Sequence, residues 1–259
     1  MTVLQQQWRN RTLLQGAVAL GLGACVVFSF WWAEFSLTQL THAGPGLIEF
    51  FSRLVPPDLS ATSDVMGSVF DTVMIAFAGT FLAVVIAFPI GFLAASNVSP
   101  RWVSHPLKIV LGLIRSIPLI LVALIFVMSI GLGPFAGTLA IAFHSIGMLG
   151  KFYAEEFETA DKGIINAVSG TGATWLQTMR FGLLPQSMAQ VISFTIYRFE
   201  MNFRDSTILG IVGAGGIGFY IKVYIGGFQY EKVAVLLLAI MGVVLLLDQL
   251  TLWLRKRIR

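Results

Sequence analysis

Residues 166–185, N-A-V-S-G-T-G-A-T-W-L-Q-T-M-R-F-G-L-L-P, form a polar island between long apolar runs. Apolar residues on both sides of Gly172 recur at helical spacing, which predicts two short amphipathic helices hinged at that glycine. Pro185 lies just ahead of the next apolar run, where a new helix can begin. Helices this short are not stable alone in water, so their apolar faces must pack against the rest of the chain or against a partner.

The composition around this segment is typical of a membrane protein. Of the 259 residues, 56% are hydrophobic and only 12% are charged, and residues 12–33, 72–100 and 116–150 carry no Asp, Glu, Lys or Arg. A membrane-crossing helix needs about 20 apolar residues, so the third gap has room for two helices joined by a turn at residues 131–134. Further apolar runs follow Pro185 and cover residues 233–254. We therefore expect an all-α polytopic membrane protein with six transmembrane helices.

The distribution of basic residues predicts which side of the membrane each loop occupies. With the N-terminus in the cytoplasm, eleven of the seventeen Lys and Arg fall inside, three fall outside and three fall within spans. This bias accounts for the net charge of +4 without a nucleic-acid partner. It also places both termini and the loop of residues 154–186 in the cytoplasm. The basic C-terminus, residues 255–259, is expected to anchor beside anionic lipid headgroups.

The intervals within residues 166–185 resemble the cytoplasmic loop of bacterial ABC importer permeases. That loop has E-A-A, three residues, a glycine, nine residues and then I-x-L-P. Ala167, Gly172 and Pro185 occupy matching positions, whereas Asn166 stands where the family has Glu. The resemblance implies coupling helices that dock in a groove of a partner ATPase. The residues that it assigns to coupling are Asn166, Ala167, Gly172, Ala173, Trp175 and Pro185. An ordinary membrane-protein loop with helical turns is the alternative.

The segment before residue 206 places charged residues inside an expected span. Each such charge costs at least about 2.5–3.5 kcal/mol at the centre of a membrane helix unless it is compensated. Glu200 and Arg204 are four residues apart and can pair, as can Arg198 and Asn202. Two interpretations stay open: a structural salt-bridge lattice, or a hydrated lining for an anion with arginines available to oxyanions. The candidate pathway residues are Arg198, Glu200, Asn202, Arg204, Arg115 and His144.

The glycine run G-A-G-G-I-G at residues 213–218 formally satisfies the dinucleotide-binding pattern. No βαβ unit surrounds it, and a long apolar run follows instead. A re-entrant turn or gate is the better interpretation, because irregular backbone in a membrane is tolerated where it is buried or lines a cavity. The residues of this expected turn are Gly213, Gly215, Gly216, Ile217 and Gly218.

No catalytic or metal-binding arrangement is expected. His144 and Ser145 are adjacent on a helix and point about 100° apart, so they do not form a serine-protease pair. Cys25 is the single cysteine, which leaves no disulfide framework or metal cluster. A phosphate-binding G-x-x-x-x-G-K-[ST] motif is absent from the sequence. We expect a protein that is not an enzyme and binds no cofactor, with ATP and Mg bound by a separate ATPase subunit.

The combination R-x-E-x-N-x-R, residues 198–204, followed by I-L-G-x-V-G-A-G-G-I-G is similar to the phosphonate branch of the type I ABC importer permeases. The resemblance implies a single permease domain over residues 1–259, with a peripheral helix at residues 1–35 and a core at residues 66–253. It further implies a homodimer in the bacterial inner membrane, two ATPase subunits, a periplasmic binding protein and a substrate such as phosphite or an alkylphosphonate. Three alternatives remain: an importer permease for methionine or another small polar solute, a secondary transporter, and a membrane enzyme.

Overall fold

The computed structural model describes the backbone of residues 3–258 and the side chains of residues 14–39 and 41–258. Within these ranges every regular element is a helix, which confirms the all-α fold class. In chain order the elements are α1 (Val3–Trp32), α2 (Leu37–Arg53), the 3₁₀ turn η1 (Leu59–Ala61), α3 (Thr62–Ala94), α4 (Arg101–Ser116), α5 (Leu119–Ile130), α6 (Pro134–Thr159), α7 (Lys162–Gly170), α8 (Trp175–Thr178), the π-helical turn η2 (Met179–Leu183), α9 (Leu184–Ile211), α10 (Ile217–Gly226) and α11 (Tyr230–Ile258).

The helices divide into two compact units, Met1–Arg53 and Leu54–Arg259. The first unit holds α1 and α2, and the Leu14–Trp32 part of α1 is long and apolar enough to cross a membrane. The second unit holds every element from η1 onward. All the candidate site residues therefore belong to the second unit.

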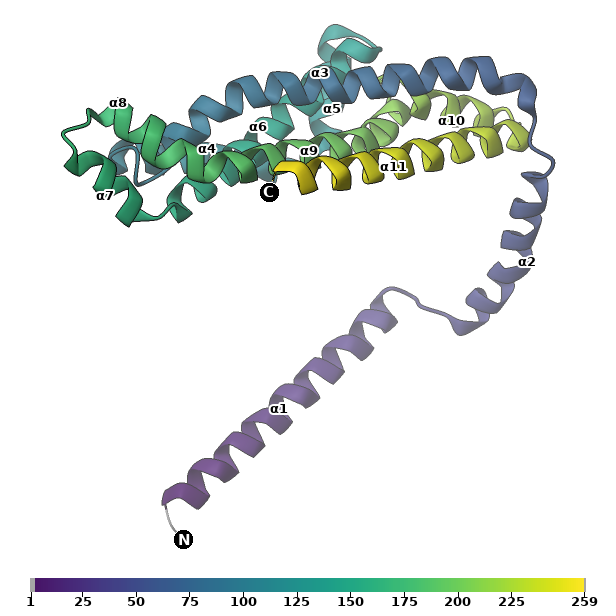
Figure 1. The fold of residues 1–259 in the computed structure, drawn as a ribbon. Helices are drawn as coiled ribbons and strands as arrows, with labels where there is room; N and C mark the ends of the chain where they lie inside the picture. Colours follow the sequence, from purple (N-terminus) through teal and green to yellow (C-terminus); the bar gives the residue numbers. More distant parts are fainter. Residues whose placement is uncertain (1–2, 259) are drawn as a thin grey trace. The chain divides into compact units, whose positions relative to one another are not determined.

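Helix α6 lies at the centre of the second unit, where it packs against α3, α4, α5 and α9 (Figure 1). Small residues let α3 approach α6 closely. A Cβ atom at Gly79 would lie 2.6 Å from the side chain of Ile141, and one at Gly91 would lie 2.7 Å from the carbonyl oxygen of Gly150. Membrane helices commonly pack through such small residues, because lipid supplies no hydrophobic drive for helix association. The small residues therefore allow close packing of α3 against α6.

The structure does not confirm the expected count of six spans. Among the described residues, four helical segments are long and apolar enough to cross a membrane: Leu14–Trp32, Leu59–Ala94, Pro134–Thr159 and Tyr230–Ile258. Helices α4 and α5 make a fifth candidate only if counted together, and they are bent by 82°. Helix α5 alone has 12 residues, or about 18 Å, against a hydrocarbon core of about 30 Å. The expected third span is therefore a broken one.

Helix α9 has the length of a span, at 28 residues, but not the composition of one. Four charged residues lie inside it, and it is not among the helices that qualify as spans by length and composition. Such a helix is compatible with a membrane when its charges pair with one another or face a water-filled cavity. Whether α9 can cross a membrane therefore depends on which groups its charged side chains contact.

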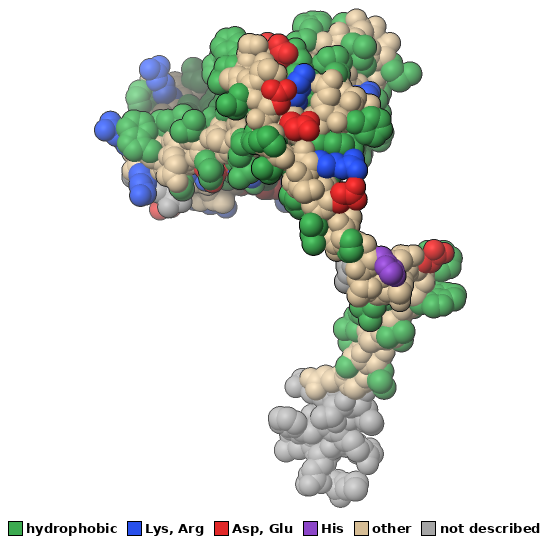
Figure 2. Space-filling view, turned by 90° about the vertical axis from the view of Figure 1, so that its right-hand side faces the viewer, with side chains coloured by type: hydrophobic (Ala, Val, Ile, Leu, Met, Phe, Trp, Pro, Cys, Tyr) green, Lys and Arg blue, Asp and Glu red, His purple; other side chains and the backbone are tan. Residues whose placement is uncertain are grey.

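The second unit has two distinct ends. Helices α7 and α8 lie at one end, and α10 lies toward the other (Figure 1). The end away from α7 and α8 carries acidic and basic side chains close together among apolar ones (Figure 2). There Asp58 caps η1, and hydrogen bonds from Ser60 hold the pKa of the Asp58 carboxyl below its ordinary value. The backbone N–H of Asp58 also donates to the carbonyl oxygen of Glu231, which ties η1 to the start of α11.

Candidate functional site

Arg198 of α9 is the centre of a buried polar cluster between α9 and α6. Its side chain is 4% exposed. It donates hydrogen bonds to Ser145 Oγ at 3.0 Å, His144 Nδ1 at 3.0 Å and Asp205 Oδ2 at 3.3 Å. Because a guanidinium has only donors, His144 accepts at Nδ1 and is neutral, with its proton on Nε2. Asp205 therefore supplies the compensating charge, and α6 supplies the remaining acceptors.

Asn202 extends this cluster to α3. Its side chain is fully buried, its Nδ2 donates to Thr80 Oγ1 at 2.8 Å, and its Oδ1 accepts from Ser145 Oγ at 3.1 Å. Arg198 and Asn202 are thus joined through Ser145, rather than to each other as the four-residue spacing predicted. A buried polar network in which each member has a partner favours one arrangement of its helices. The series of hydrogen bonds that joins Thr80, Asn202, Ser145 and Arg198 therefore links α3, α6 and α9.

A second ionic cluster lies on the other side of α9, toward α11. Arg204 pairs with Glu200 at 2.6 Å, as the sequence predicted, and also with Asp248 of α11 at 3.6 Å. The side chains of Arg204 and Asp248 are 44% and 49% exposed, whereas that of Glu200 is 9% exposed. At about 100° per residue, positions 198 and 200 face nearly opposite directions. The expected pathway residues of α9 are therefore split between two separate clusters.

Arg115, in the last turn of α4, borders the first cluster on the side of His144. The guanidinium carbon of Arg115 lies 5.6 Å from the centre of the Phe152 ring. A Cβ atom at Gly147, one turn from His144, would lie 2.9 Å from the backbone nitrogen of Arg115. Arg115 is exposed and His144 is half-buried. The structure thus brings Arg115, His144 and Arg198 to one side of the unit, and places Glu200 and Arg204 on another.

The glycine run forms a tightly packed turn between α9 and α10. Gly213, Gly215 and Gly216 have φ angles of 94°, 80° and 72°, which side chains rarely adopt. A Cβ atom at Gly218 would lie 1.9 Å from a carbonyl oxygen of α9. The buried Ile217 donates its backbone N–H to Thr72 Oγ1 of α3 at 2.8 Å. The turn therefore needs glycine for its backbone conformation and for the close approach of two helices.

The segment of residues 162–178 consists of two short helices joined by a turn at Gly172, which confirms the prediction from periodicity. Gly172 has a φ angle of 84°, and its surroundings leave open space for a Cβ atom. Asp161 caps α7 by accepting a hydrogen bond from the N–H of Gly163 at 2.7 Å. Thr174 and Gln177 form a reciprocal capping box at the start of α8. Side-chain caps thus define both helix starts, and glycine permits the turn between them.

The surface of this segment keeps several large apolar side chains exposed. Ile164, Trp175, Leu176 and Phe181 are 46%, 53%, 68% and 62% exposed. Among the residues expected to couple, Asn166, Ala167, Gly172, Trp175 and Pro185 are exposed and Ala173 is half-buried. An apolar surface at a membrane protein's polar end is typical of a protein contact. The segment is therefore built as a rigid protrusion with an accessible face.

This protrusion has direct connections to the long helices. Helix α8 continues through the π-helical turn η2 into α9 without a loop. The side chain of Gln186 in α9 accepts a hydrogen bond from the backbone N–H of Asp161 at 2.9 Å. The ring of Trp175 lies 6.3 Å from that of Phe92 at the end of α3. A displacement of α7 and α8 would therefore act on both α9 and α3.

The sequence did not single out several members of these clusters as partners. Thr80 and Met148 lie in apolar runs without any distinguishing pattern, and only the fold brings them to Arg198 and Asn202. Asp248 carried a usable signal, because a lone carboxylate inside a long apolar run needs a partner. In the part of the chain that the structure describes, no group of three or more His, Cys, Asp or Glu is arranged to hold a metal ion.

Comparisons with known proteins agree on one family of membrane transport components. The family described as "Binding-protein-dependent transport system inner membrane component" matches residues 87–259. The chain is 36% identical over 249 residues to the phosphite transport system permease protein PtxC of Stutzerimonas stutzeri, covering 94% of this chain and 89% of that protein. It is 34% identical over 252 residues to the phosphate-import permease protein PhnE of Mycolicibacterium smegmatis, covering 96% of this chain and 47% of that protein.

Among solved structures, a chain of the MetNI methionine ABC transporter in an inward-facing conformation has the same fold. The TM-score is 0.68 at 19% sequence identity, and the match covers 78% of this chain and 99% of that chain. At this identity the similarity concerns the fold alone. It agrees with an all-α bundle in which short helices protrude from one end.

Proposed function

The chain belongs to the family of binding-protein-dependent transport system inner membrane components, and we propose that it is the membrane-spanning subunit of an ATP-driven importer for a phosphorus oxyanion. The observation that carries the substrate class is the relation to a phosphite transport permease over 94% of this chain. As a membrane component of a transport system, the chain is a multi-pass inner membrane protein and not itself an enzyme. Phosphite and alkylphosphonates are the substrates that we propose.

The charge balance favours one of the two clusters as the surface that meets the anion. Arg204 faces two carboxylates, those of Glu200 and Asp248, and Arg255 also interacts electrostatically with Glu200, so that cluster has no excess positive charge. On the other side, Arg198 is balanced by Asp205 and Arg115 adds a further positive charge near the neutral His144. An anion is attracted to the side with excess positive charge. The proposed pathway therefore runs along Arg115, His144 and Arg198, and Arg204 fastens α9 to α11.

We propose that Asn166, Ala167, Gly172, Ala173, Trp175 and Pro185 couple the permease to a cytoplasmic ATPase, with both termini of the chain on the same side of the membrane. Closure of the ATPase subunits on ATP and Mg would push the protrusion. The Gln186 and Trp175 contacts offer a route to α9 and α3. Movement of α9 would then shift Arg198 relative to α6, and the packed turn at Gly213, Gly215, Gly216, Ile217 and Gly218 would act as the gate at the opposite end.

The proposed assembly contains two copies of this permease, two ATPase subunits and a periplasmic binding protein. The experiment that tests the function measures uptake of radiolabelled phosphite or methylphosphonate. Cells that lack their own transporters would express the chain with its neighbouring ATPase and binding-protein genes. We expect ATP-dependent uptake that competes with phosphorus oxyanions and not with methionine. Competition by methionine alone would place the chain with importers of a small polar solute instead, and would refute the proposed substrate class.

A further inference from the structure

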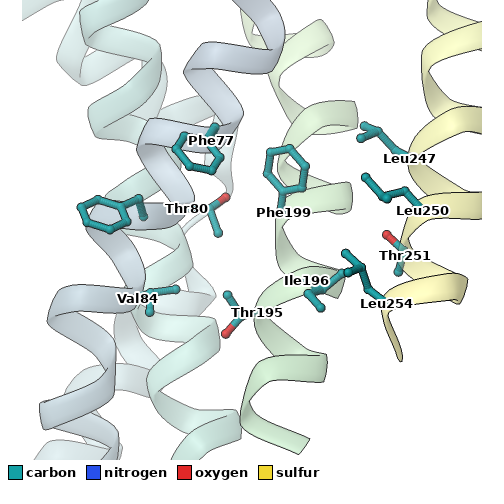
Figure 3. A pocket seen from close by; sticks show the side chains of 11 residues that line it. Phe77, Thr80, Val84, Thr195, Ile196, Phe199, Leu247, Leu250, Thr251 and Leu254 are labelled. Carbon is teal, nitrogen blue, oxygen red and sulfur yellow. The ribbon is translucent and has the colours of Figure 1, made fainter. Parts of the chain in front are cut away.

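An apolar cleft with a volume of 290 Å³ lies between α3, α9 and α11, as Figure 3 shows. Phe77 of α3, Phe199 of α9 and Leu250 of α11 project into it. No charged side chain is among the described residues that line it. Its volume is just below the roughly 300–1,000 Å³ of small-molecule pockets. The cleft is therefore large enough for part of an elongated hydrocarbon group.

Two of the three threonine hydroxyls in the cleft wall, those of Thr80 and Thr195, already have partners within the protein. Thr80 Oγ1 donates to the carbonyl oxygen of Ala76 and accepts from Asn202. Thr195 Oγ1 bonds with the carbonyl oxygen of Val191 and with the hydroxyl of Tyr153. An oxyanion would find few free donors here and would lose its hydration. The wall suits an apolar occupant and not the transported anion.

The rim of the cleft faces outward from the second unit. The side chains of Phe81 and Leu250, which line it, are 59% and 50% exposed. In a bilayer, apolar side chains with this exposure on membrane-spanning helices are in contact with acyl chains. From Leu247 to Leu254 the α11 wall extends for about 10 Å along the helix, at 1.5 Å per residue. The cleft is therefore an elongated opening toward lipid.

Arg255 lies at the end of the cleft that is nearest the C-terminus. Leu254 lines the cleft, and Arg255 follows it in α11. The guanidinium of Arg255 donates to the carbonyl oxygen of Ser193 at 3.4 Å and lies 5.5 Å from the centre of the Tyr197 ring, both on α9. Its Nε is buried and has no hydrogen-bond partner within the described chain. A buried donor of this kind is costly unless an acceptor reaches it.

We propose that the cleft and Arg255 form a binding site for one anionic phospholipid of the surrounding bilayer. One acyl chain lies between α3, α9 and α11, and the headgroup phosphate accepts hydrogen bonds from Arg255. Arginine suits a phosphate because its donors form a rigid fork. Lys256 and Arg257, which follow in the same turn, add positive charge at the same headgroup level. The bound lipid fastens α11 to the two helices that carry the Thr80–Asn202 contact.

The test uses photoactivatable lipids and the full-length chain, purified with the subunits that accompany it and placed in phosphatidylcholine nanodiscs. Phosphatidylglycerol and phosphatidylcholine, each with a diazirine on the same acyl chain, are compared by mass spectrometry of the labelled peptides. We expect labelling of the segments around Phe81, Phe199 and Leu250. The anionic lipid should label them about fivefold more, which corresponds to about 1 kcal/mol for one basic residue at an anionic surface.

Two matched variants separate a specific site from general attraction to a basic helix end. Arg255→Gln should remove the preference for the anionic lipid. Arg257→Gln should keep it, because Arg257 lies over the ring of Trp253, 4.8 Å from its centre, on its own helix. Equal labelling by the two lipids in the unaltered chain, or equal loss in both variants, would overturn the headgroup site.

A third variant tests whether an acyl chain enters the cleft. Leu250→Trp fills the space, so labelling of the cleft segments should fall for both lipids while labelling of α1 stays the same. Unchanged labelling of the cleft would overturn the proposal. Cross-links between two copies of the chain at these segments, in place of lipid labelling, would also overturn it and would show an interface between copies.

Discussion

Replacing Arg198 with methionine removes the group that joins α9 to α6 and leaves the Asp205 carboxylate without its counter-charge. Breaking a buried ion pair by removing one partner costs about 3–5 kcal/mol. The Asp205 side chain is 26% exposed, so water partly solvates the carboxylate that remains. His144 and Ser145 lose a donor but can turn to other partners. We therefore expect a loss at the lower end, about 3 kcal/mol of unfolding free energy.

The assay is thermal unfolding of the detergent-solubilised protein, followed by tryptophan fluorescence. For a chain of this size about 1 kcal/mol shifts Tm by roughly 2–4 °C, so Arg198→Met should lower Tm by about 6–12 °C. Adding Asp205→Asn should recover part of the loss, because it removes the unpaired carboxylate. Arg115→Met is the control, since the Arg115 side chain is exposed at the end of α4 and stacks on one ring.

Two results would refute this account of the Arg198 cluster. The first is a Tm within about 2 °C of the unaltered protein, which is less than 1 kcal/mol for a chain of this size. The second is strict additivity of the Arg198→Met and Asp205→Asn effects, because residues in one network should be coupled. Either would mean that the cluster does not hold α9 against α6.

Three further substitutions test the coupling turn, the glycine turn and the second ionic cluster. Gly172→Val should reduce uptake severely, because the turn has open space but a φ angle that costs a β-branched residue about 1–2 kcal/mol. That cost corresponds to a fall in Tm of roughly 2–8 °C for a chain of this size. Gly170→Val, in open space without a positive φ, is the control for uptake. Gly218→Ala should lower the amount of folded protein in the membrane, because its Cβ would meet a carbonyl oxygen at 1.9 Å, whereas Gly226→Ala should be tolerated in the same membrane fractionation. Asp248→Asn should lower Tm by no more than about 4 °C in the unfolding assay, because a half-exposed pair contributes at most about 1 kcal/mol.

Each of these has a contrary outcome. Equal uptake by the Gly172 and Gly170 variants would show that the turn conformation is not needed for coupling. Normal accumulation of Gly218→Ala would mean that α9 and α10 can separate at no cost. A loss of stability in Asp248→Asn as large as that of Arg198→Met would show that the half-exposed cluster is the more important one.

Sequence patterns predicted the two short helices of the protruding segment, because these helices depend on residues close together in the sequence. Helical spacing around Gly172 and the position of Pro185 depend on neighbours within one or two turns, and both appear in the structure as expected. The pairing of Glu200 with Arg204 was predicted for the same reason, since residues four apart share a helix face.

Contacts between distant helices could not be predicted in this way. The spacing rule paired Arg198 with Asn202, whereas the fold supplies Ser145 from α6 between them. Pro118 lies at the break between α4 and α5, but a proline alone does not determine the 82° angle between two helices that both pack against α6. Hydropathy likewise could not show how all the charges of α9 are compensated, because Asp248, the second partner of Arg204, lies on α11 and only the fold brings it near.

ATP hydrolysis by the assembled transporter in lipid tests the central claim most directly. The permease would be purified with its ATPase, reconstituted, and titrated with binding protein and with phosphite, methylphosphonate or methionine. We predict that hydrolysis rises only when binding protein and a phosphorus oxyanion are both present, and that Gly172→Val abolishes this rise while the complex stays assembled. Absence of any associating ATPase, or stimulation by methionine and not by a phosphorus oxyanion, would contradict the proposed importer.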